Sequence, residues 1–332
     1  MIKMLFFDLK ESEKKYFEDN YPSDFDIKFF KESLNEDTKL TVKECDETVI
    51  ISVYTKSLIT QKVLEKFKNI RLISIRSNNY ENVDIKACKN RNIAVVNISD
   101  SENTSVAQYV LGTIFMQARN INKSISDFKN KINRYEEYEG RDISKLSIGI
   151  IGTGIIGTSV CKLANLMKMK IYAYDITPNK DLYEIAEYLP LVDLLRKSDI
   201  VTLHLPYNKD LYHFISEKEL EIMKETAVLI NTSHGKLVDT IALCKAIKNK
   251  KIKGAVLDVI ECENNYYNFN LKNISKETSL EILLLQELLI SEKAIITPSI
   301  SQNTTDSVNK KLEITFNNIK EYFKGGRLNR VD

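Results

Sequence analysis

Ile148-Gly-Ile-Ile-Gly-Thr-Gly-Ile-Ile-Gly157 is the stretch of this chain that decides its fold. It has the pattern of a buried strand that enters a tight turn and continues as a helix. Its last three glycines form G-x-G-x-x-G: the first permits the turn, the second lets a pyrophosphate approach the backbone, and the third lets helix and strand pack closely. Free N–H groups at the helix start attract phosphate. The stretch therefore predicts a dinucleotide site at Gly152, Gly154, Ile155, Ile156 and Gly157.

A second predicted strand, Lys170-Ile-Tyr-Ala-Tyr-Asp175, follows the helix and ends in an acid. At this place in a βαβ unit, a carboxylate accepts hydrogen bonds from the ribose hydroxyls and repels a 2′-phosphate. The glycine motif alone is weak, because a glycine turn can also be purely structural. Strand, turn, helix, second strand and acid in this order make the pattern specific. We therefore expect NAD rather than NADP, with Asp175 at the ribose.

Bulk composition narrows the class of protein. A chain of 332 residues can hold two domains, and its formal net charge of +2 gives no electrostatic case for nucleic acid. The start of the chain has the pattern of a strand rather than a signal peptide, and no apolar run is long enough to span a bilayer. The scattered cysteines, without C-x-x-C, predict reduced thiols in a cytoplasmic protein, with neither a disulfide framework nor a metal site. They are Cys45, Cys88, Cys161, Cys244 and Cys262.

Short apolar runs alternate with amphipathic segments along the whole chain, which predicts an α/β fold with two doubly wound, mostly parallel sheets. The expected domains are a discontinuous substrate domain, 1–101 plus 299–332, and an inserted nucleotide domain, 102–298. We expect a long helix over 105–120 and a last helix over 304–324. A substrate is expected in the cleft between the domains, at the carboxyl ends of the strands.

The chain resembles the D-isomer-specific 2-hydroxyacid dehydrogenases, most closely their D-lactate dehydrogenase branch, over essentially its whole length. The resemblance implies NAD as cofactor, a small 2-oxo acid as substrate, and a homodimer formed through the helix over 105–120. It also implies that strand ends line the cofactor at Leu205, Pro206, Thr232, Ser233 and Asp258. The segments that carry it are Arg76-Ser77 with Asn82-Val-Asp84, the glycine motif with Asp175, 201–206, 229–239, 254–261 and 296–298.

Two of the three catalytic positions that the resemblance implies are substituted. The family's arginine, which grips the substrate carboxylate, maps to His234 in Asn231-Thr-Ser-His-Gly235. The family's proton-donating histidine maps to Ser299, directly after Thr297-Pro298. The glutamate that orients that histidine is kept, as Glu263.

The substrate loop departs from the family as well. A glycine whose backbone binds the carboxylate maps to Asn79, next to Asn78, and a tyrosine of the lactate branch maps to Ser101. A glutamate ahead of the long helix maps to Gln108. Arg76 is either structural, as in the family motif, or holds an acidic ligand in place of the missing arginine.

The size of the contributions lost with the family's arginine and histidine leaves three hypotheses for the function. An arginine–carboxylate contact contributes roughly 1.5–3 kcal/mol, and a positioned general acid contributes about 10²–10⁴ in rate. The first hypothesis is therefore an NAD-dependent oxidoreductase with altered chemistry, in which His234 exchanges the proton and Glu263 tunes it. The second is an NAD(H)-binding pseudoenzyme, a redox sensor or partner subunit. An ordinary D-lactate dehydrogenase ranks lower, because Ser299 and His234 would have to replace histidine and arginine.

Several other residues have simpler interpretations. His204 and His213 are expected to pack and hydrogen-bond rather than to catalyse. Cys262 is expected to be a spectator, since no basic neighbour in the sequence would form its thiolate. The leucine stripe around 280–289 predicts a core or subunit contact.

Overall fold

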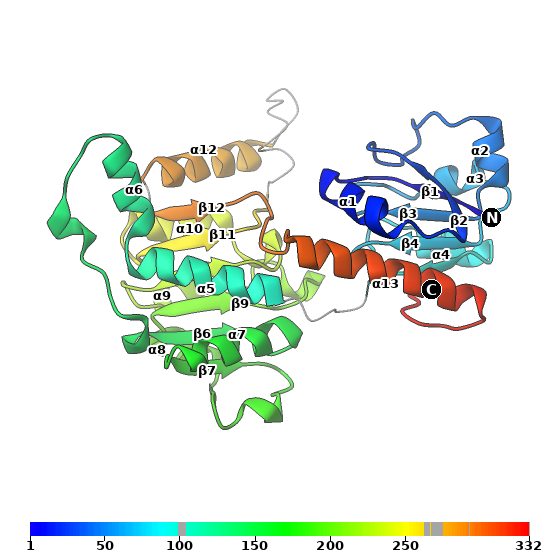
Figure 1. Cartoon of the computed structure of the whole chain (residues 1–332). Coiled ribbons are helices and arrows are strands. Elements are labelled where there is room, and N and C mark those ends of the chain that lie inside the picture. Colours follow the sequence, from blue (N-terminus) through cyan, green and yellow to red (C-terminus); the bar gives the residue numbers. More distant parts are fainter. Residues whose placement is uncertain (99–103, 262–265, 267–274, 292, 332) are drawn as a thin grey trace. The chain divides into compact units, whose positions relative to one another are not determined.

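The computed structural model describes residues 1–98, 104–261, 266, 275–291 and 293–331. The chain divides into two compact units, the first formed by Met1–Ser101 with Thr304–Asp332 and the second by Glu102–Asn303. Within the described residues each unit is a parallel sheet with helices on both faces (Figure 1). The predicted fold class, two parallel-sheet α/β domains, is confirmed.

The first unit has the strand order β2-β1-β3-β4-β5 among its described residues, with every neighbouring pair parallel. Helices α1 and α13 cover one face, where Phe17, Leu312 and Phe316 pack against Met4 and Phe6. Helices α3 and α4 cover the other face. The elements are β1 (Ile2–Phe6), α1 (Glu11–Asn20), β2 (Phe25–Phe29), α2 (Val42–Glu47), β3 (Ile50–Val53), α3 (Gln61–Glu65), β4 (Leu72–Ile75), α4 (Ile85–Asn90), β5 (Ala94–Val96) and α13 (Thr305–Phe323).

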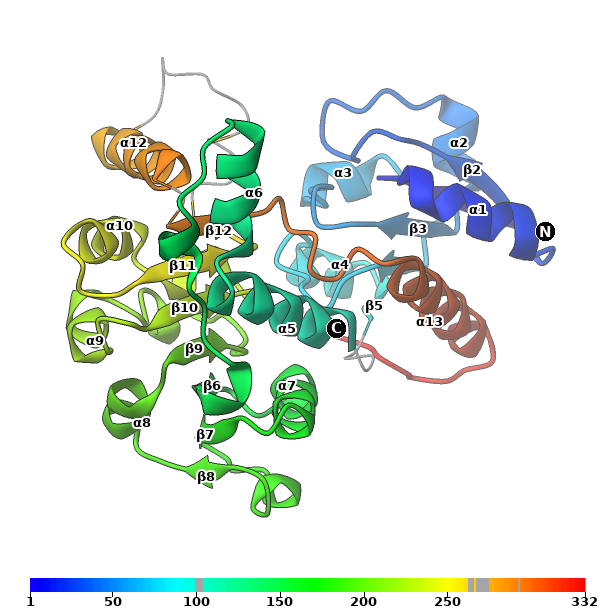
Figure 2. The ribbon, with the colours of Figure 1, turned by 60° about the vertical axis from the view of Figure 1, so that its left-hand side comes forward.

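The second unit has the order β12-β11-β10-β9-β6-β7-β8 among its described residues, again with every neighbouring pair parallel. Figure 2 shows α5 and α7 on one face of this sheet and α8, α9, α10 and α12 on the other. The elements are α5 (Thr104–Ala118), α6 (Ile121–Lys129), β6 (Ser147–Ile151), α7 (Ile155–Leu166), β7 (Lys170–Tyr174), β8 (Glu187–Tyr188), α8 (Leu191–Lys197), β9 (Ile200–Leu203), α9 (Glu217–Ile222), β10 (Val228–Asn231), α10 (Thr240–Lys248), β11 (Gly254–Leu257), α12 (Lys276–Ile290) and β12 (Ala294–Ile296).

Continuous apolar runs form the central strands because helices cover both sides of each sheet. Every residue of β3, β4, β6, β9, β10 and β11 is buried. The sequence did not predict α2 or β8, and α3 is only five residues long. In the structure the chain re-enters the first unit at Thr304 rather than at Ser299. The backbone N–H groups of Ile300 and Ser301 donate to the Asp258 carboxylate, which ties this segment to the second unit.

The buried arginine Arg76 joins several elements of the first unit. Its guanidinium donates to Ser52 Oγ at 2.9 Å and to the Phe7 carbonyl at 2.6 Å, and Nε lies 3.3 Å from Glu13 Oε1. It also lies over the Phe6 ring, 3.7 Å from the centroid. Arg76 thus neutralises Glu13 and satisfies the Phe7 carbonyl after β1 and the Ser52 hydroxyl in β3.

No helix among the described residues is long and apolar enough to cross a membrane. Cys45 and Cys161 are free thiols; Cys262 lies outside the described residues.

Replacing Arg76 with methionine should lower the free energy of unfolding by about 3–5 kcal/mol, because Glu13 would remain buried without its counter-charge. The double variant Arg76→Met/Glu13→Gln should lose clearly less, since no unpaired charge remains. Urea unfolding of the wild type, the single variant and the double variant measures the difference. A double variant no more stable than the single one would show that Glu13 is not the charge that Arg76 balances.

Candidate functional site

The predicted cofactor residues gather at one edge of the second sheet. Strands β6, β9 and β10 end side by side, since Leu203 pairs with both Ile151 and Asn231. The glycine turn and the segments after β9 and β10 all begin at these paired ends. Strand order reverses between β6 and β9, the position at which parallel α/β sheets bind ligands.

The glycine turn has the geometry that the motif predicts. Gly152 has φ +92°, and a Cβ there would lie 2.5 Å from the His204 carbonyl oxygen. A Cβ on Gly157 would lie 1.9 Å from the Gly152 carbonyl oxygen, so only glycine permits this contact between α7 and the turn. Around Gly154, in contrast, a Cβ would meet nothing within 4 Å. The backbone at Gly154, which caps α7, is therefore open to a bulky anionic group.

The acid at the end of β7 lies beside this turn. Asp175 Oδ2 accepts hydrogen bonds from Thr153 N–H at 2.6 Å and from Thr153 Oγ at 3.1 Å, and Oδ1 accepts from Thr177 N–H. A carboxylate has about four acceptor positions, so the half-buried Asp175 can still accept from a ribose. Its negative charge beside the turn suits NAD and disfavours a 2′-phosphate.

The other predicted cofactor residues lie near the same edge. Leu205 is half-buried and Pro206 is exposed after β9, while Ile155 and Ile156 open α7. Ser233 Oγ donates to the Leu203 carbonyl at 2.6 Å. Thr232 Oγ is buried and has no hydrogen-bond partner among the described residues, so it is a polar atom that a ligand could satisfy. The glycine turn, Asp175 and this hydroxyl together fit NAD.

His234 lies in the segment after β10 and has a fixed ring. Its Nδ1 accepts a hydrogen bond from Lys236 N–H at 3.2 Å. The ring stacks on Tyr207, with centroids 4.4 Å apart and planes at 11°. Asn231 Nδ2 donates to the His234 carbonyl at 2.9 Å and so holds the loop itself. Because Nδ1 is an acceptor, a neutral His234 carries its hydrogen on Nε2.

The Asp258 carboxylate accepts hydrogen bonds from other groups of the protein. Asp258 is 1% exposed and accepts from Thr297 Oγ at 2.6 Å besides the two backbone donors after β12. Since the Thr297 hydrogen goes to Asp258, the Tyr109 phenol must donate to Thr297 Oγ, 2.6 Å away. This chain fixes the segment that carries Ser299, whose backbone has φ +53°. In this arrangement Asp258 positions a loop; direct cofactor contact stays a prediction.

Ser299 itself is exposed. Its N–H donates to the Asp258 carbonyl at 2.9 Å, but no described side chain hydrogen-bonds to its hydroxyl. A serine hydroxyl needs an adjacent base to take part in proton transfer near neutral pH. Glu263, the predicted partner of His234, lies outside the described residues, and their contact stays a prediction.

The predicted substrate residues belong to the first unit. Asn78 and Asn79 are exposed after β4, where Asn79 N–H donates to Ser77 Oγ at 3.2 Å. Arg76 is 0% exposed and its guanidinium is enclosed by protein atoms. The expectation that Arg76 holds a ligand is therefore not met by this placement, and its role is structural. Ser101 lies outside the described residues.

Sequence reasoning missed a histidine–carboxylate pair beside the His234 loop. His213 Nε2 lies 2.9 Å from Glu261 Oε2, and Nδ1 lies 3.7 Å from Asp239 Oδ2. The ring also stacks on Tyr212, and burial, followed by the Glu261 carboxylate, raises the pKa of that phenol to about 12. Only the three-dimensional structure joins these residues. The pair supports the loop, because His213 N–H donates to the Lys236 carbonyl.

His204 is a packing residue, as expected. Its Nε2 lies 3.0 Å from Thr202 Oγ, and Nδ1 is buried without a hydrogen-bond partner among the described residues. Burial lowers the pKa of His204 to about 3. The ring is therefore neutral near pH 7.

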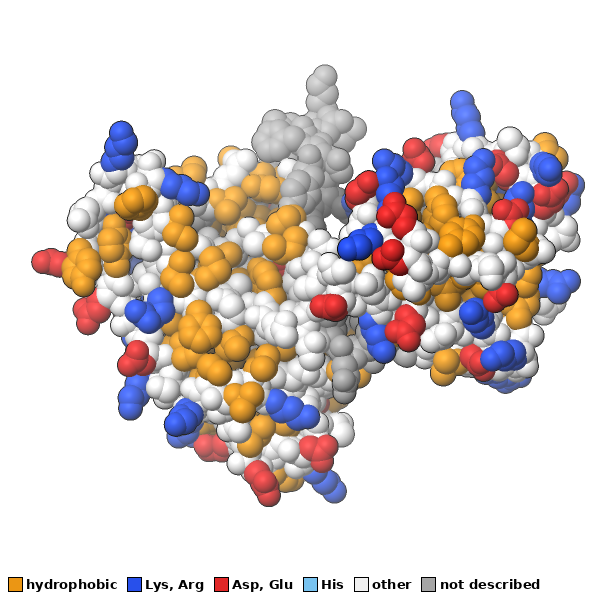
Figure 3. Space-filling model, viewed as in Figure 1, with side chains coloured by type: hydrophobic (Ala, Val, Ile, Leu, Met, Phe, Trp, Pro, Cys, Tyr) orange, Lys and Arg blue, Asp and Glu red, His pale blue; other side chains and the backbone are white. Residues whose placement is uncertain are grey.

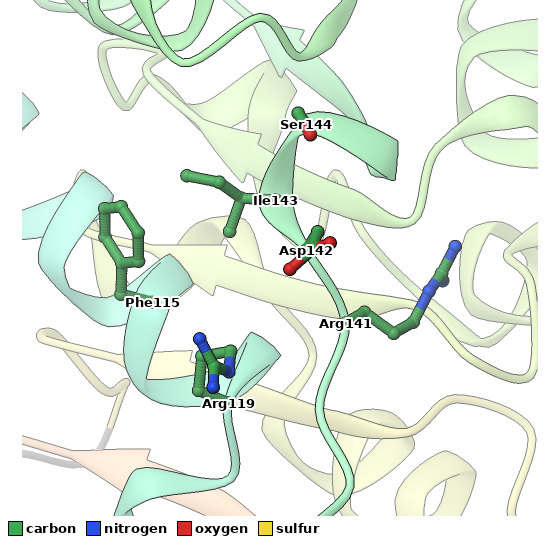
Figure 4. A pocket seen from close by; sticks show the side chains of 6 residues that line it. All are labelled: Phe115, Arg119, Arg141, Asp142, Ile143 and Ser144. Atoms are coloured by element: carbon green, nitrogen blue, oxygen red, sulfur yellow. The ribbon is translucent and has the colours of Figure 1, made fainter.

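Two cavities lie elsewhere on the second unit. One, of about 210 Å³, is lined by Phe115 and Arg119 of α5 and by residues 141–144 ahead of β6 (Figure 4). The other, of about 270 Å³, lies around Leu146, Asp199 and Lys253. Both are at the amino ends of the strands, opposite the glycine turn, so neither is the cofactor site.

Comparison with known proteins agrees with this geometry. Residues 111–301 match the family model described as D-isomer specific 2-hydroxyacid dehydrogenase, NAD binding domain. The chain belongs to this family. The second unit is its NAD-binding domain, and family members act on small 2-hydroxy and 2-oxo acids.

Individual relatives cover most of the chain. A D-specific alpha-keto acid dehydrogenase of Enterococcus faecium is 33% identical over 274 residues, 82% of this chain and 82% of the relative. The structure of Aquifex aeolicus D-lactate dehydrogenase complexed with NAD and lactic acid matches with a TM-score of 0.83 and 29% identity, covering 99% of this chain and 98% of that one. Apo D-lactate dehydrogenase from Escherichia coli matches with a TM-score of 0.86 and 25% identity, covering 99% and 100%.

Two glycine variants should separate cofactor binding from folding. Gly154→Ala fits the protein without contact, so thermal stability should stay nearly unchanged while NADH affinity falls about tenfold or more through collision with the pyrophosphate. Gly157→Ala should lower both, because its Cβ would strike the Gly152 carbonyl. Thermal melting and NADH titration by calorimetry measure the two effects. Full NADH affinity in Gly154→Ala would place the pyrophosphate elsewhere.

His204 should make the protein sensitive to acid. Its folded-state pKa lies below that of an exposed histidine, so the unfolded chain binds more protons between about pH 6.5 and pH 3. Stability should therefore be complete above about pH 6.5 and fall as the pH drops through this window. Urea midpoints at pH 7.5 and pH 4.5 should differ less in His204→Gln than in the wild type. An equal drop in both proteins would assign the effect to other groups.

Proposed function

We propose that this protein is an NAD-dependent oxidoreductase of small 2-oxo or 2-hydroxy acids. In this proposal His234 polarises the substrate carbonyl, a role that the family's arginine has in other members. The observation that carries the proposal is the Lys236 N–H bond to Nδ1, which leaves Nε2 as the hydrogen-bearing atom. A neutral imidazole held this way can polarise a carbonyl by donating a hydrogen bond. Stacking on Tyr207 fixes the direction in which that bond points.

The roles of the protein residues follow from this arrangement. Bound NAD supplies or accepts the hydride. Gly152, Gly154 and Gly157 would hold its pyrophosphate, and Asp175 its ribose. His234 Nε2–H would stabilise negative charge that develops on the substrate oxygen and give that oxygen its proton, the imidazole then being reprotonated from water, and Glu263 would tune the imidazole. The chain of Tyr109, Thr297 and Asp258 would keep the segment around Ser299 in place.

A second candidate function is an NAD(H)-binding pseudoenzyme that acts as a redox sensor or partner subunit. Ser299 favours it, because its hydroxyl has no hydrogen-bonding side chain among the described residues. A cofactor site that is kept beside a substituted proton donor is what such a protein would have. It predicts tight NADH binding without oxidation of NADH by any of a broad panel of 2-oxo acids.

His234 variants should decide between these functions. His234→Ala should lower kcat/KM for the best 2-oxo acid at least 100-fold, the effect expected for an oxyanion donor. His234→Gln, which keeps an N–H donor, should recover part of that loss if Nε2 only donates a hydrogen bond, and none if it must transfer a proton. His213→Ala is the control for a general loss of loop structure. Unchanged turnover in His234→Ala would remove His234 from the reaction.

We also propose that two copies associate through the face formed by α5 and α6, and that the protein is cytoplasmic. Exposed apolar side chains gather over these helices (Figure 3), among them Phe115, Ile125 and Phe128, which is 84% exposed. Exposed apolar side chains gathered on one face in this way are typical of a subunit contact.

The oligomeric state tests this association directly. Light scattering after gel filtration should give about twice the chain mass of 38.2 kDa. Phe128→Asp should shift the protein toward that single-chain mass, because it places a charge in the contact. Val42→Asp, at an apolar position of the first unit that is 76% exposed, should not. A wild-type mass near 38.2 kDa would contradict the dimer.

A further inference from the structure

A series of hydrogen bonds within the second unit ends on the carboxylate of Asp175. Asn179 N–H donates to the Tyr188 oxygen at 2.9 Å, and the Tyr188 oxygen lies 2.9 Å from Thr153 Oγ. Thr153 Oγ lies 3.1 Å from Asp175 Oδ2. We call these four residues the Asp175 network. It joins the glycine turn to the segment that follows β7, and Tyr188 enters it from β8.

The carboxylate sets the direction of every hydrogen in the Asp175 network. An ionised carboxylate can only accept, so the hydrogen between Thr153 Oγ and Asp175 Oδ2 belongs to Thr153. Thr153 has no second hydroxyl hydrogen, and therefore Tyr188 donates to Thr153 Oγ while its own oxygen accepts from Asn179 N–H. Hydrogen bonds that follow one another in the same direction strengthen each other. The Tyr188 phenol thus reinforces the bond that Thr153 makes to Asp175.

Thr153 and Thr177 together fix the plane of the Asp175 carboxylate. Oδ2 accepts from Thr153 N–H at 2.6 Å as well as from the Thr153 hydroxyl, and Oδ1 accepts from Thr177 N–H at 2.9 Å. A carboxylate has about four acceptor positions. Among the described residues, these donors fill both positions of Oδ2 and one of Oδ1. The acceptor position that remains for a ligand is therefore on Oδ1.

The segment after β7 has a second attachment that does not involve Tyr188. Asn179 Nδ2 donates to Thr158 Oγ of α7 at 3.1 Å, and Thr158 Oγ donates to the Thr153 carbonyl at 3.0 Å. These two bonds tie the segment to the glycine turn independently of the phenol. Removal of the Tyr188 hydroxyl should therefore weaken the hold on Asp175 without releasing the segment.

We propose that Thr153 and Tyr188 are positioning residues for Asp175 and that they increase the preference of this protein for NAD over NADP. The inference rests on the proposed function, which places Asp175 at the ribose. A carboxylate whose Oδ2 is bound by Thr153 does not turn away from a 2′-phosphate, so the repulsion between the two charges is kept. The free acceptor position of Oδ1 is also oriented before the ribose arrives, which lowers the entropy lost on binding.

The ratio of NADH affinity to NADPH affinity tests this role in the full-length protein. Calorimetric titration with NADH, and with NADPH as its competitor, gives both affinities. Thr153→Val, which has nearly the same shape, and Tyr188→Phe should each lower the ratio about 2- to 10-fold, the effect of one lost hydrogen bond. Thr153→Ser keeps the hydroxyl and should keep most of the ratio. A general loosening of the glycine turn would weaken both cofactors alike, because they share the pyrophosphate, and would leave the ratio unchanged.

A neighbouring tyrosine provides the matched control for Tyr188→Phe. The Tyr183 ring packs edge-on against the Tyr188 ring with centroids 5.6 Å apart, and Tyr183 is 57% exposed. No group among the described residues hydrogen-bonds to its hydroxyl. Tyr183→Phe should therefore leave the affinity ratio unchanged. Melting temperatures check that each variant is folded.

Asp175→Ala separates this inference from the proposed function. In the Asp175→Ala background, Thr153→Val should not change the affinity ratio further, because a positioning residue acts through the carboxylate. An equal change with and without Asp175 overturns the inference. An unchanged ratio in both Thr153→Val and Tyr188→Phe also overturns it, and the proposed role of Asp175 then stands if Asp175→Ala still lowers the ratio. A ratio that depends on Thr153 in a protein that reduces no 2-oxo acid supports the inference and overturns the proposed function.

Discussion

Parallel pairing is the constraint on which the rest of this structure depends. Every neighbouring pair of strands described in either sheet is parallel, so within each unit the strands end at the same edge. Segments that are far apart in the sequence therefore lie close together because the strands before them end at the same edge. This proximity does not require direct contacts between the segments. Asp175, the glycine turn and the His234 loop owe their proximity to this edge.

Local sequence rules predicted the parts of the site that a single segment determines. The glycine turn has one workable backbone, because Gly152 needs a positive φ and Gly157 leaves no room for a Cβ. Its spacing is therefore readable in the sequence. The same holds for Asp175, since a strand of fixed length after a helix places its last residue beside the turn. The α/β alternation predicted both sheets for the same reason.

Contacts between segments that lie far apart in the chain could not be predicted from the sequence. Nothing in the sequence joins Tyr188 to Thr153, or His213 to Glu261, because the packing of the segment after β7 and of the loop after β9 depends on the whole fold. Arg76 shows the opposite case, in which the sequence indicated a role that the structure does not support. Its charge suggested a ligand site, but its partner Glu13 is 63 residues earlier, and only the structure shows that the pair is enclosed. The short strand β8 was missed because two residues carry too little periodicity.

The slot that holds the His234 ring limits which residues can replace this histidine. The slot consists of a flat aromatic face from Tyr207 and a backbone N–H from Lys236. Histidine uses both, because it has a flat ring and an acceptor atom. A guanidinium could stack on the same face but has only donors, so it would leave the Lys236 N–H without its partner. An arginine at position 234 would therefore need the loop to move as well, so this position accepts a histidine more readily than an arginine.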